Sequence, residues 1–299
     1  MIVTRGVNKA YGGTVVVNDV SLALRAGGVT SVIGPNGAGK STLLSMISRL
    51  LGMDAGSIQV DGLDVAATPT RQLAQRLAVL RQDNHISARL TVQDLVAFGR
   101  YPHNRGRPRP GDQAHVDRAI AYLGLEEVRA RYLDELSGGQ RQRAFVAMAL
   151  AQDTDYLLLD EPLNNLDIKH ASRMMALLRR AADELGRTVV VVLHDINFAS
   201  WYSDTIVAMK HGHVHSEGPP EEIIREEQLS DLYETPIRVV EVDGRRICLF
   251  YDNDCDNELP VAPRACALRP SRASPATPVA RRRPRNGPAG ARPPAPAPA

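Results

Sequence analysis

The sequence predicts an α/β fold with a mostly parallel central sheet. Unbroken apolar runs, "YLLLD" at 156–160 and "TVVVVLHD" at 188–195, are typical of strands buried on both faces. A glycine-rich loop, "GPNGAGKST" at 34–42, stands between a predicted strand and a predicted helix. Because a helix start directs backbone N–H groups at an anion, this loop indicates a phosphate site.

Composition sets broad limits on the class of protein. The chain has 299 residues, of which 43% are hydrophobic, enough for a substantial core. It contains no apolar run of about 18 residues and no signal-peptide pattern at its start, so we expect a cytoplasmic protein. Three cysteines without a CxxC pair predict no disulfide framework. Aromatic residues make up only 4%, which argues against stacking of single-stranded nucleic acid.

Charge divides the chain unevenly. Residues 261–299 carry eight arginines and no acidic residue, so with a total of +2 the rest of the chain has a charge of −6. A mildly acidic folded part predicts no nucleic-acid partner. Pro, Ala and Arg dominate residues 259–299, a composition that favours disorder. An RNA- or lipid-binding tail and a readthrough or frameshifted extension are the alternatives.

The N-terminal elements lead into the glycine loop and out of it. Apolar stretches in residues 1–33 predict short strands, and a helix is expected from Lys40 to about Leu51. "SIQVDG" at 57–62 ends in a turn, and "RLAVLRQ" at 76–82 has the same apolar character. Both are therefore predicted as strands.

A helix-rich block then interrupts the α/β pattern. Helical patterns occupy 91–99, 112–124 and 138–152. They predict a helical subdomain, about residues 84–152, inserted into the sheet domain. Beyond it, residues 168–186 form a predicted helix that Gly186 ends, and residues 204–250 hold shorter strands and helices. We expect the folded domain to comprise residues 1–252.

A second predicted helix start resembles the first in chemistry. In "LSGGQRQR" at 136–143, Ser137 is followed by Gly138 and Gly139 where a helix begins. Unpaired N–H groups and the helix dipole favour a phosphate there as well. The chain thus has two predicted phosphate cradles about a hundred residues apart.

Each residue type in the first cradle suits phosphate chemistry. Gly34, Gly37 and Gly39 let the backbone approach an anion without a Cβ clash. Lys40 supplies a positive charge for the β- and γ-phosphates, and Ser41 a hydroxyl for Mg²⁺. The loop matches G-x-x-x-x-G-K-[ST] in full, in the expected strand–loop–helix context.

Polar residues that follow other predicted strands fit the same chemistry. Asp160 ends an apolar strand and is placed to hold Mg²⁺. Glu161 beside it can polarise a water for attack on the γ-phosphate. His194 can contact that phosphate, and Gln82 can reach the metal or the water. Taken alone, an acidic turn, a structural histidine and a surface glutamine would be the simpler readings.

Together these motifs resemble those of ABC transporter ATPase subunits. The similarity covers residues 1 to about 252, in the family's order and spacing. It comprises the phosphate loop "GPNGAGKST", the Q-loop Gln82, the signature "LSGGQ", the Walker B strand "LLLDEP", the D-loop "NNLD" at 164–167, the switch histidine His194 and the adenine-stacking Tyr11.

The resemblance implies a P-loop NTPase fold with a mostly parallel core, an N-terminal antiparallel β subdomain and an inserted α-helical subdomain. It implies ATP and Mg²⁺ as cofactors, and a homodimer in which the signature of one subunit caps the nucleotide on its twin. Implied nucleotide contacts are Tyr11, Gly34, Pro35, Asn36, Gly37, Ala38, Gly39, Lys40, Ser41, Thr42, Ser137, Gly138, Gly139 and Gln140. Implied metal contacts are Ser41, Gln82 and Asp160. Implied catalytic residues are Glu161, His194 and Gln82.

Three classes within this resemblance compete. A chromosome or DNA-repair ATPase needs a long heptad insertion, and a translation-associated ATPase needs two cassettes; neither is present. A transporter engine remains. "AFGRYPHNRGR" at 97–107 and "DEPLNNLDIKH" at 160–170 resemble the iron(III)–siderophore import branch, which includes haem and cobalamin importers.

The resemblance also implies where partners bind. Residues 83–101 would contact transmembrane permease subunits, so the chain would lie at the cytoplasmic face of the cell membrane as a peripheral protein. A substrate-binding protein would complete the system.

Two further clusters have simpler explanations than metal binding. His211, His213 and His215 alternate, so on one strand they would share a face and could bind zinc. An exposed hairpin is the expectation. "YDNDCDNE" at 251–258 lacks the spacing of a calcium loop and is expected to be a solvated domain end.

Overall fold

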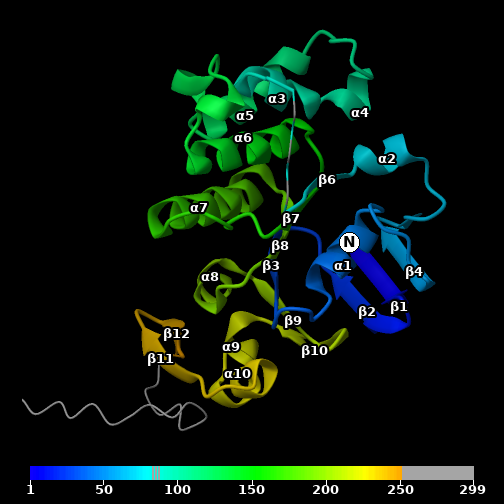
Figure 1. The fold of residues 1–299 in the computed structure, drawn as a ribbon, viewed down its shortest axis with the longest axis vertical. Coiled ribbons are helices and arrows are strands. Elements are labelled where there is room, and N and C mark those ends of the chain that lie inside the picture. Colours follow the sequence, from blue (N-terminus) through cyan, green and yellow to red (C-terminus); the bar gives the residue numbers. More distant parts are fainter. Residues whose placement is uncertain (83, 85, 87, 251–299) are drawn as a thin grey trace, which may run out of the picture. The chain divides into compact units, whose positions relative to one another are not determined.

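Six strands form the central sheet, in the order β10-β9-β3-β8-β7-β6 (Figure 1). The computed structural model describes residues 1–250 except 83, 85 and 87. Its strands are β3 (Gly28–Ile33), β6 (Leu77–Leu80), β7 (Tyr156–Asp160), β8 (Thr188–Val192), β9 (Thr205–Lys210) and β10 (His213–Gly218). The pairs from β9 to β6 are parallel, and β10 pairs antiparallel at one edge. The predicted parallel core is confirmed.

The chain divides into two units, Met1–Asn253 and Asp254–Ala299. The predicted tail, the acidic stretch at 251–258 and two of the three cysteines lie outside the described residues. The expected disorder of the tail therefore stays a prediction.

The strand β8 explains why an unbroken apolar run forms a strand here. All five of its residues are buried. Val189 and Val191 pack in one hydrophobic cluster, and Val190 and Val192 pack in another. The clusters lie on opposite faces because successive side chains of a strand alternate. The run nonetheless ends at Val192, so the expected strand to residue 195 was too long by three residues.

A second, antiparallel sheet has the order β2-β1-β4-β5. It consists of β1 (Ile2–Tyr11), β2 (Thr14–Leu24), β4 (Ala55–Val60) and β5 (Leu63–Asp64). The first two are long strands rather than the short ones expected. Gly12 and Gly13, both with positive φ, join them in a tight turn. A short pair, β11 (Arg238–Val242) and β12 (Arg245–Leu249), lies near the end of the described chain.

Helices cover both faces of the central sheet. Figure 1 shows α1 and the antiparallel sheet on one side, and α7 and α8 on the other. The helices of this domain are α1 (Lys40–Ile47), α2 (Thr70–Ala74), α7 (Ile168–Leu185), α8 (Ile196–Tyr202), α9 (Pro220–Ile223) and α10 (Glu226–Tyr233). The helix expected to reach Leu51 ends at Ile47, because Arg49 adopts a left-handed conformation. Gly186 ends α7 as predicted.

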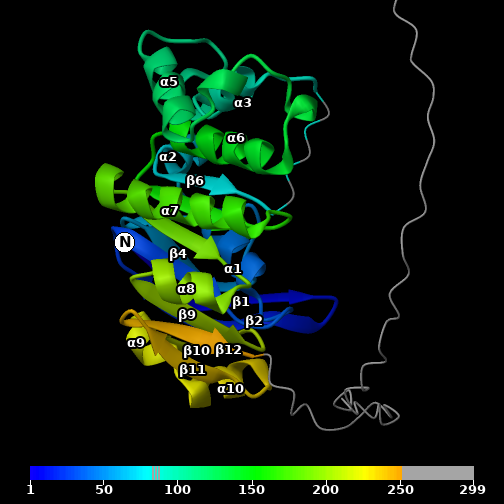
Figure 2. The ribbon, with the colours of Figure 1, turned by 90° about the vertical axis from the view of Figure 1, so that its left-hand side faces the viewer.

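The other helices form a separate layer next to α7 (Figure 2). They are α3 (Val92–Phe98), α4 (Tyr101–Asn104), α5 (Asp112–Tyr122) and α6 (Gly138–Ala151), with short 3₁₀ turns at Glu126–Val128 and Leu133–Glu135. We call these residues, 92–151, the helical lobe. Figure 1 places α6 beside α7, and α6 also contacts the strand β6, so these elements connect the lobe to the sheet domain.

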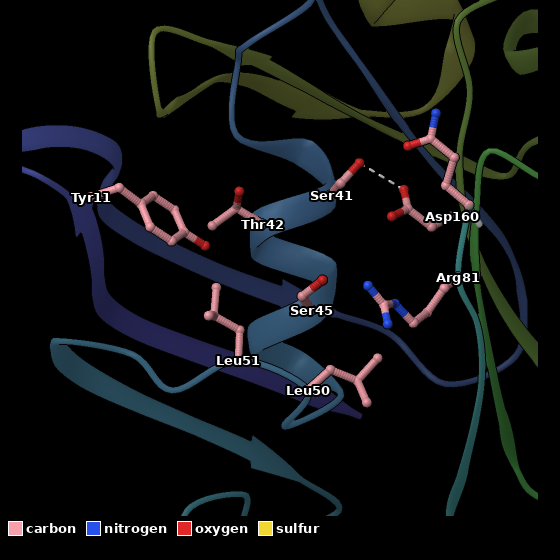
Figure 3. Close-up of a pocket in the computed structure, with 9 residues that line it drawn as sticks. Tyr11, Ser41, Thr42, Ser45, Leu50, Leu51, Arg81 and Asp160 are labelled. Atoms are coloured by element: carbon pink, nitrogen blue, oxygen red, sulfur yellow. Dashed lines mark hydrogen bonds between the residues drawn. The ribbon is translucent and has the colours of Figure 1, made fainter. Parts of the chain in front are cut away.

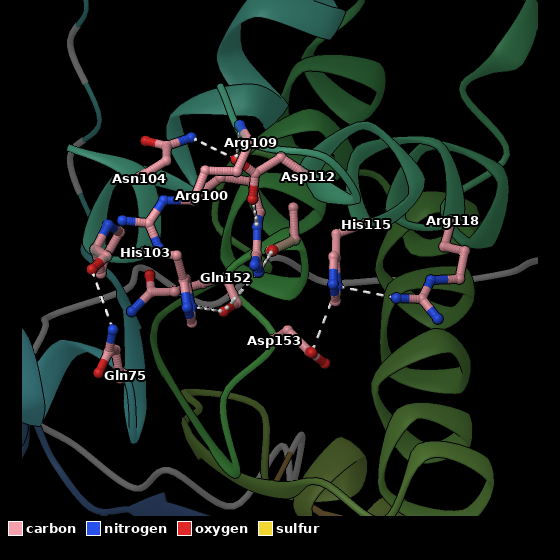
Figure 4. A network of polar contacts seen from close by, with 12 residues as sticks. Gln75, Arg100, His103, Asn104, Arg109, Asp112, His115, Arg118, Gln152 and Asp153 are labelled. Atoms are coloured by element: carbon pink, nitrogen blue, oxygen red, sulfur yellow. Dashed lines mark hydrogen bonds and ion pairs between the residues drawn. The ribbon is translucent and has the colours of Figure 1, made fainter. Parts of the chain in front are cut away.

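A polar network holds the helical lobe together and ties it to the strand β6 (Figure 4). The buried Arg100 guanidinium donates to Asp112 at 3.0 Å and to the carbonyl of Ala151 at 2.9 Å. Burial opposes ionisation of Asp112, but its hydrogen bonds and Arg100 outweigh that effect and lower its pKa to about 2. The side chain of Gln152 donates to the carbonyl of Leu77 at 2.9 Å.

The three alternating histidines do not share a strand. His211 lies in the turn before β10, with φ of 48°, and the strand begins at His213. Gly212 accompanies it at positive φ, since the reversal between β9 and β10 needs left-handed residues. His213 contacts Asn18, and His215 lies 3.5 Å from Asp231. Within residues 1–250, where described, no group of three or more His, Cys, Asp or Glu is arranged to hold a metal.

No helix among the described residues is both long and apolar enough to cross a membrane.

Candidate functional site

The glycine loop lies between β3 and α1, where its backbone is held close to other strands. Gly34 has φ of 139°, and a Cβ there would overlap the carbonyl oxygen of Met209 on β9. Gly39 has φ of 94° and caps α1; its Cβ would lie 2.5 Å from the carbonyl of Val16 on β2. Only glycine fits these two positions, because they combine positive φ with close backbone contact.

Within the loop, Ala38 is buried and its amide donates to the carbonyl of Pro35 at 3.3 Å. Asn36 and Gly37 are exposed at the tip. The amide groups at the start of α1 therefore surround a concave backbone, which is the geometry that binds a phosphate.

Lys40 is folded back onto this loop. Its ammonium donates to the carbonyls of Gly34 and Pro35, both at 2.9 Å, and the residue is only 5% exposed. Burial lowers the pKa of Lys40, and the charges of Glu161 and Asp160 oppose the shift. A phosphate carries more negative charge than a carbonyl oxygen. A bound phosphate would therefore replace these carbonyl groups as the partner of the buried ammonium.

Ser41 and Asp160 meet across the site. The hydroxyl of Ser41, on the first turn of α1, donates to Asp160 Oδ1 at 2.8 Å. Burial raises the pKa of Asp160, although the hydrogen bond from Ser41 opposes the shift. A hydroxyl and a carboxylate on adjacent elements supply the oxygen ligands that Mg²⁺ prefers. The residues present thus fit this metal.

Glu161 lies at the centre of a polar cluster. The residue is 9% exposed. It directly follows the end of β7 and has a positive backbone φ of 49°. Gln82 donates to its Oε2 at 2.7 Å, and Asn164 donates to the same oxygen. His194 Nε2 lies 2.6 Å from Oε1. The tertiary structure therefore brings together three residues that the sequence singled out separately, Gln82, Glu161 and His194.

A pocket of about 390 Å³ opens beside α1. Figure 3 shows Tyr11 on one side of the helix and Asp160 on the other, with Ser41 and Thr42 between them. Tyr11 is half exposed, and the Lys9 ammonium lies over its ring, 5.7 Å from the ring centre. Of the predicted nucleotide and metal contacts, this pocket is lined by Tyr11, Ser41, Thr42, Gln82 and Asp160.

Four residues line this pocket that the sequence did not reveal: Ser45, Leu50, Leu51 and Arg81. Ser45 follows Ser41 by one helical turn, a spacing that could have indicated a shared face. Leu50 and Leu51 reach the pocket because the chain leaves α1 early, and no sequence pattern signals that. Arg81 points toward Ser45 in Figure 3, and its place next to Gln82 was the available sign.

The signature residues stand apart from this pocket. Ser137 caps α6: its hydroxyl accepts from the Gln140 amide at 3.3 Å, and the Gln140 side chain accepts from the Ser137 amide at 3.0 Å. Ser137 and Gly138 are exposed, whereas Gly139 is buried. None of these residues is among those that line the pocket beside α1. The second cradle therefore faces solvent in the single chain.

Comparisons with known proteins show the family of the chain. Residues 17–164 match the ABC transporter family. The chain is 51% identical over 251 residues to the petrobactin import ATP-binding protein YclP of Bacillus subtilis, covering 84% of this chain and 100% of that protein. It is also 51% identical to the petrobactin import ATP-binding protein FatE of Bacillus anthracis, covering 80% and 96%. Among solved structures, the dimeric ATP-binding cassette MJ0796 in a post-hydrolysis state with ADP and Pi has a TM-score of 0.66 at 28% identity, covering 74% and 99%.

Proposed function

Since the chain belongs to the ATP-binding proteins of ABC transporters, we propose that it hydrolyses ATP to power a membrane importer of iron(III)–siderophore complexes. The cluster of Gln82, His194 and Asn164 around the Glu161 carboxylate is the observation that carries the ATPase assignment. The cargo assignment rests on similarity to relatives, because two proteins that are 51% identical to this chain are petrobactin import ATP-binding proteins.

In the proposed reaction, the glycine loop and Lys40 bind the phosphates of ATP, and Tyr11 stacks on the adenine. Lys40 is already desolvated, so its interaction with phosphate is strong. Ser41, Asp160 and Gln82 would hold Mg²⁺, which neutralises charge on the β- and γ-phosphates when bound. Glu161 accepts a proton from the attacking water, and His194 donates a hydrogen bond to the γ-phosphate.

We further propose that the working unit is a homodimer. The exposed start of α6, with Ser137 and the Gly138 and Gly139 amides, offers a positive helix end and no acidic side chain in its first turn. The signature of one subunit would cap the nucleotide on the glycine loop of its twin. When the dimer closes, the positive helix end of the partner completes the set of positive groups around the γ-phosphate. Hydrolysis cleaves that phosphate from the nucleotide, so hydrolysis and reopening of the dimer are coupled.

The proposed permease contact is the segment 83–101. In its described part, Phe98 and Tyr101 expose 53% and 60% of their surfaces, so both side chains are accessible to a partner. Permease subunits docked here would hold the chain at the cytoplasmic face of the membrane, with a substrate-binding protein delivering the cargo.

Phe98→Ser should abolish transport and leave nucleotide binding within about two-fold; unchanged transport would remove this assignment.

Reconstitution tests the cargo directly. The chain is copurified with candidate permease subunits into liposomes, and ATPase activity is measured with binding proteins loaded with ferric siderophore, haem or cobalamin. Stimulation by the ferric siderophore alone supports the proposal. Stimulation by haem or cobalamin instead overturns the cargo assignment, and absence of any ATPase activity overturns the function.

A further inference from the structure

One side chain, His170 on the first turn of α7, lies against Gly139 at the start of α6. A Cβ built on Gly139 would lie 2.5 Å from Cδ2 and 2.8 Å from Cγ of the His170 ring. Real Cβ atoms do not approach a ring so closely, so a side chain at position 139 would force the His170 ring to move.

The orientation of this ring is fixed by Asp167. Asp167 Oδ1 caps α7 by accepting from the His170 amide at 2.8 Å and also contacts the ring Nδ1 at 2.7 Å. Both hydrogen bonds lower the pKa of Asp167, so the carboxylate is the acceptor and Nδ1 carries the hydrogen. The ring therefore has one orientation relative to α7 and presents its other edge to Gly139.

The loop that ends at Asp167 begins at Glu161. The amide of Asn164 donates to the Glu161 carbonyl at 3.2 Å, and the Asn164 side chain donates to the Glu161 carboxylate. These contacts hold the two ends of one loop: Asp167 holds His170, which lies against Gly139, and Asn164 holds Glu161. The contact between His170 and Gly139 joins the helical lobe to the sheet domain at the first turns of α6 and α7.

We propose that His170 is a positioning residue that sets the start of α6 relative to the loop that carries Glu161. This inference rests on the proposed ATPase function and adds a role to a residue outside the ATP-binding motifs. In a closed dimer, the signature of a subunit and the carboxylate of the same subunit serve different nucleotides. The His170 ring keeps them in register, so its loss should impair turnover without weakening ATP binding at the glycine loop.

The test is a double-mutant cycle with Gly139→Ala and His170→Ala in the full chain. His170→Ala should lower kcat roughly 10-fold and leave KM for ATP within about two-fold. Gly139→Ala places a methyl group against the ring and should lower Tm by roughly 5 °C. In the double variant Tm should recover, because alanine is otherwise favourable inside a helix. His170→Asn, which retains a donor for Asp167, should recover part of the kcat lost in His170→Ala.

Gly138→Ala is the matched control. A Cβ on Gly138 has its nearest neighbour 4.0 Å away, at the Asn165 carbonyl oxygen, so no contact with His170 exists to relieve. His170→Ala should therefore leave the Tm of Gly138→Ala variants unimproved. Equal recovery in both pairs, or a normal kcat in His170→Ala, overturns the role of His170. An inactive unsubstituted chain overturns the proposed ATPase function instead, and the Tm cycle still reports on the contact.

Discussion

At the start of α1, the chain supplies almost everything that a nucleotide phosphate would meet: the buried Lys40, the Ser41 hydroxyl and the carboxylates of Asp160 and Glu161. At the start of α6, it supplies a helix end, Ser137 and two glycines, exposed to solvent apart from Gly139. Both are glycine-bearing helix starts with the same dipole. In the proposed homodimer, the start of α1 is the complete half-site, and the start of α6 would cap a nucleotide held by the partner subunit.

Among the substitutions that test this comparison, Glu161→Gln should have the largest effect. Glu161→Gln removes the proton acceptor but keeps an oxygen for the Gln82 and Asn164 amides, so kcat should fall about 10²-fold or more. The ATP-loaded dimer should then persist, which light scattering after gel filtration would detect. Glu184→Gln on the exposed face of α7 is the control and should leave kcat within about two-fold. Normal turnover in Glu161→Gln would refute the assignment of this carboxylate.

Lys40→Ala tests the complete half-site at the binding step. Loss of a charged hydrogen-bond donor worth about 1.5–3 kcal/mol should weaken ATP binding roughly 10- to 100-fold. Equilibrium titration with a fluorescent ATP analogue measures this loss in the monomer. Retained affinity would mean that the buried ammonium serves the loop and not the nucleotide; a cooperative thermal transition confirms that the variant is folded.

Ser137→Ala tests the open helix start at the closure step. In a Glu161→Gln background, it should reduce the ATP-dependent dimer fraction about 10-fold and leave monomer affinity unchanged, because in the proposed dimer Ser137 would contact only the partner's nucleotide. It also removes a helix cap worth about 1 kcal/mol. Thr91→Ala removes a similar capping box from α3 and so controls for that loss; the dimer fraction should not change. Equal effects of the two substitutions would assign Ser137 a structural role alone.

Asp160→Asn addresses the smallest effect, on stability. Because burial raises the pKa of Asp160 above its ordinary value of 3.8, ionisation of this carboxyl destabilises the folded state. The destabilisation is absent below pH 3.8 and complete once the pH exceeds the raised folded-state pKa. Asp160→Asn should therefore raise Tm at pH 7 by a few degrees, since about 1 kcal/mol corresponds to about 2–4 °C.

The gain in stability should come with loss of Mg²⁺-dependent ATPase activity, because the complete half-site keeps charge buried for function. Thermal unfolding at pH 7 and near pH 3.5 checks the sign, with the difference between wild type and variant disappearing at the lower pH. A lower Tm of the variant at pH 7 would contradict the argument. The same substitution on the exposed Asp183 is the control.

Several parts of the site could be predicted from local sequence. The glycine loop requires residues that tolerate positive φ and close backbone contact, and Gly34 and Gly39 meet both conditions. The strands β7 and β8 were also predictable, because they are buried on both faces and consist mostly of apolar residues. Element limits were less accurate: α1 ends early at Ile47, and His211 falls in a turn, since a few left-handed residues decide each boundary.

The amino-acid sequence by itself determined which groups carry charge or hydroxyls and which strands and helices present them, because these depend on residue type and short-range periodicity. Only the tertiary structure decided that Gln82, His194 and Asn164 meet at one carboxylate, that Leu50 and Arg81 line the pocket, and that His170 lies against Gly139. Those contacts join residues far apart along the chain. They depend on sheet order and helix packing, which no local pattern specifies.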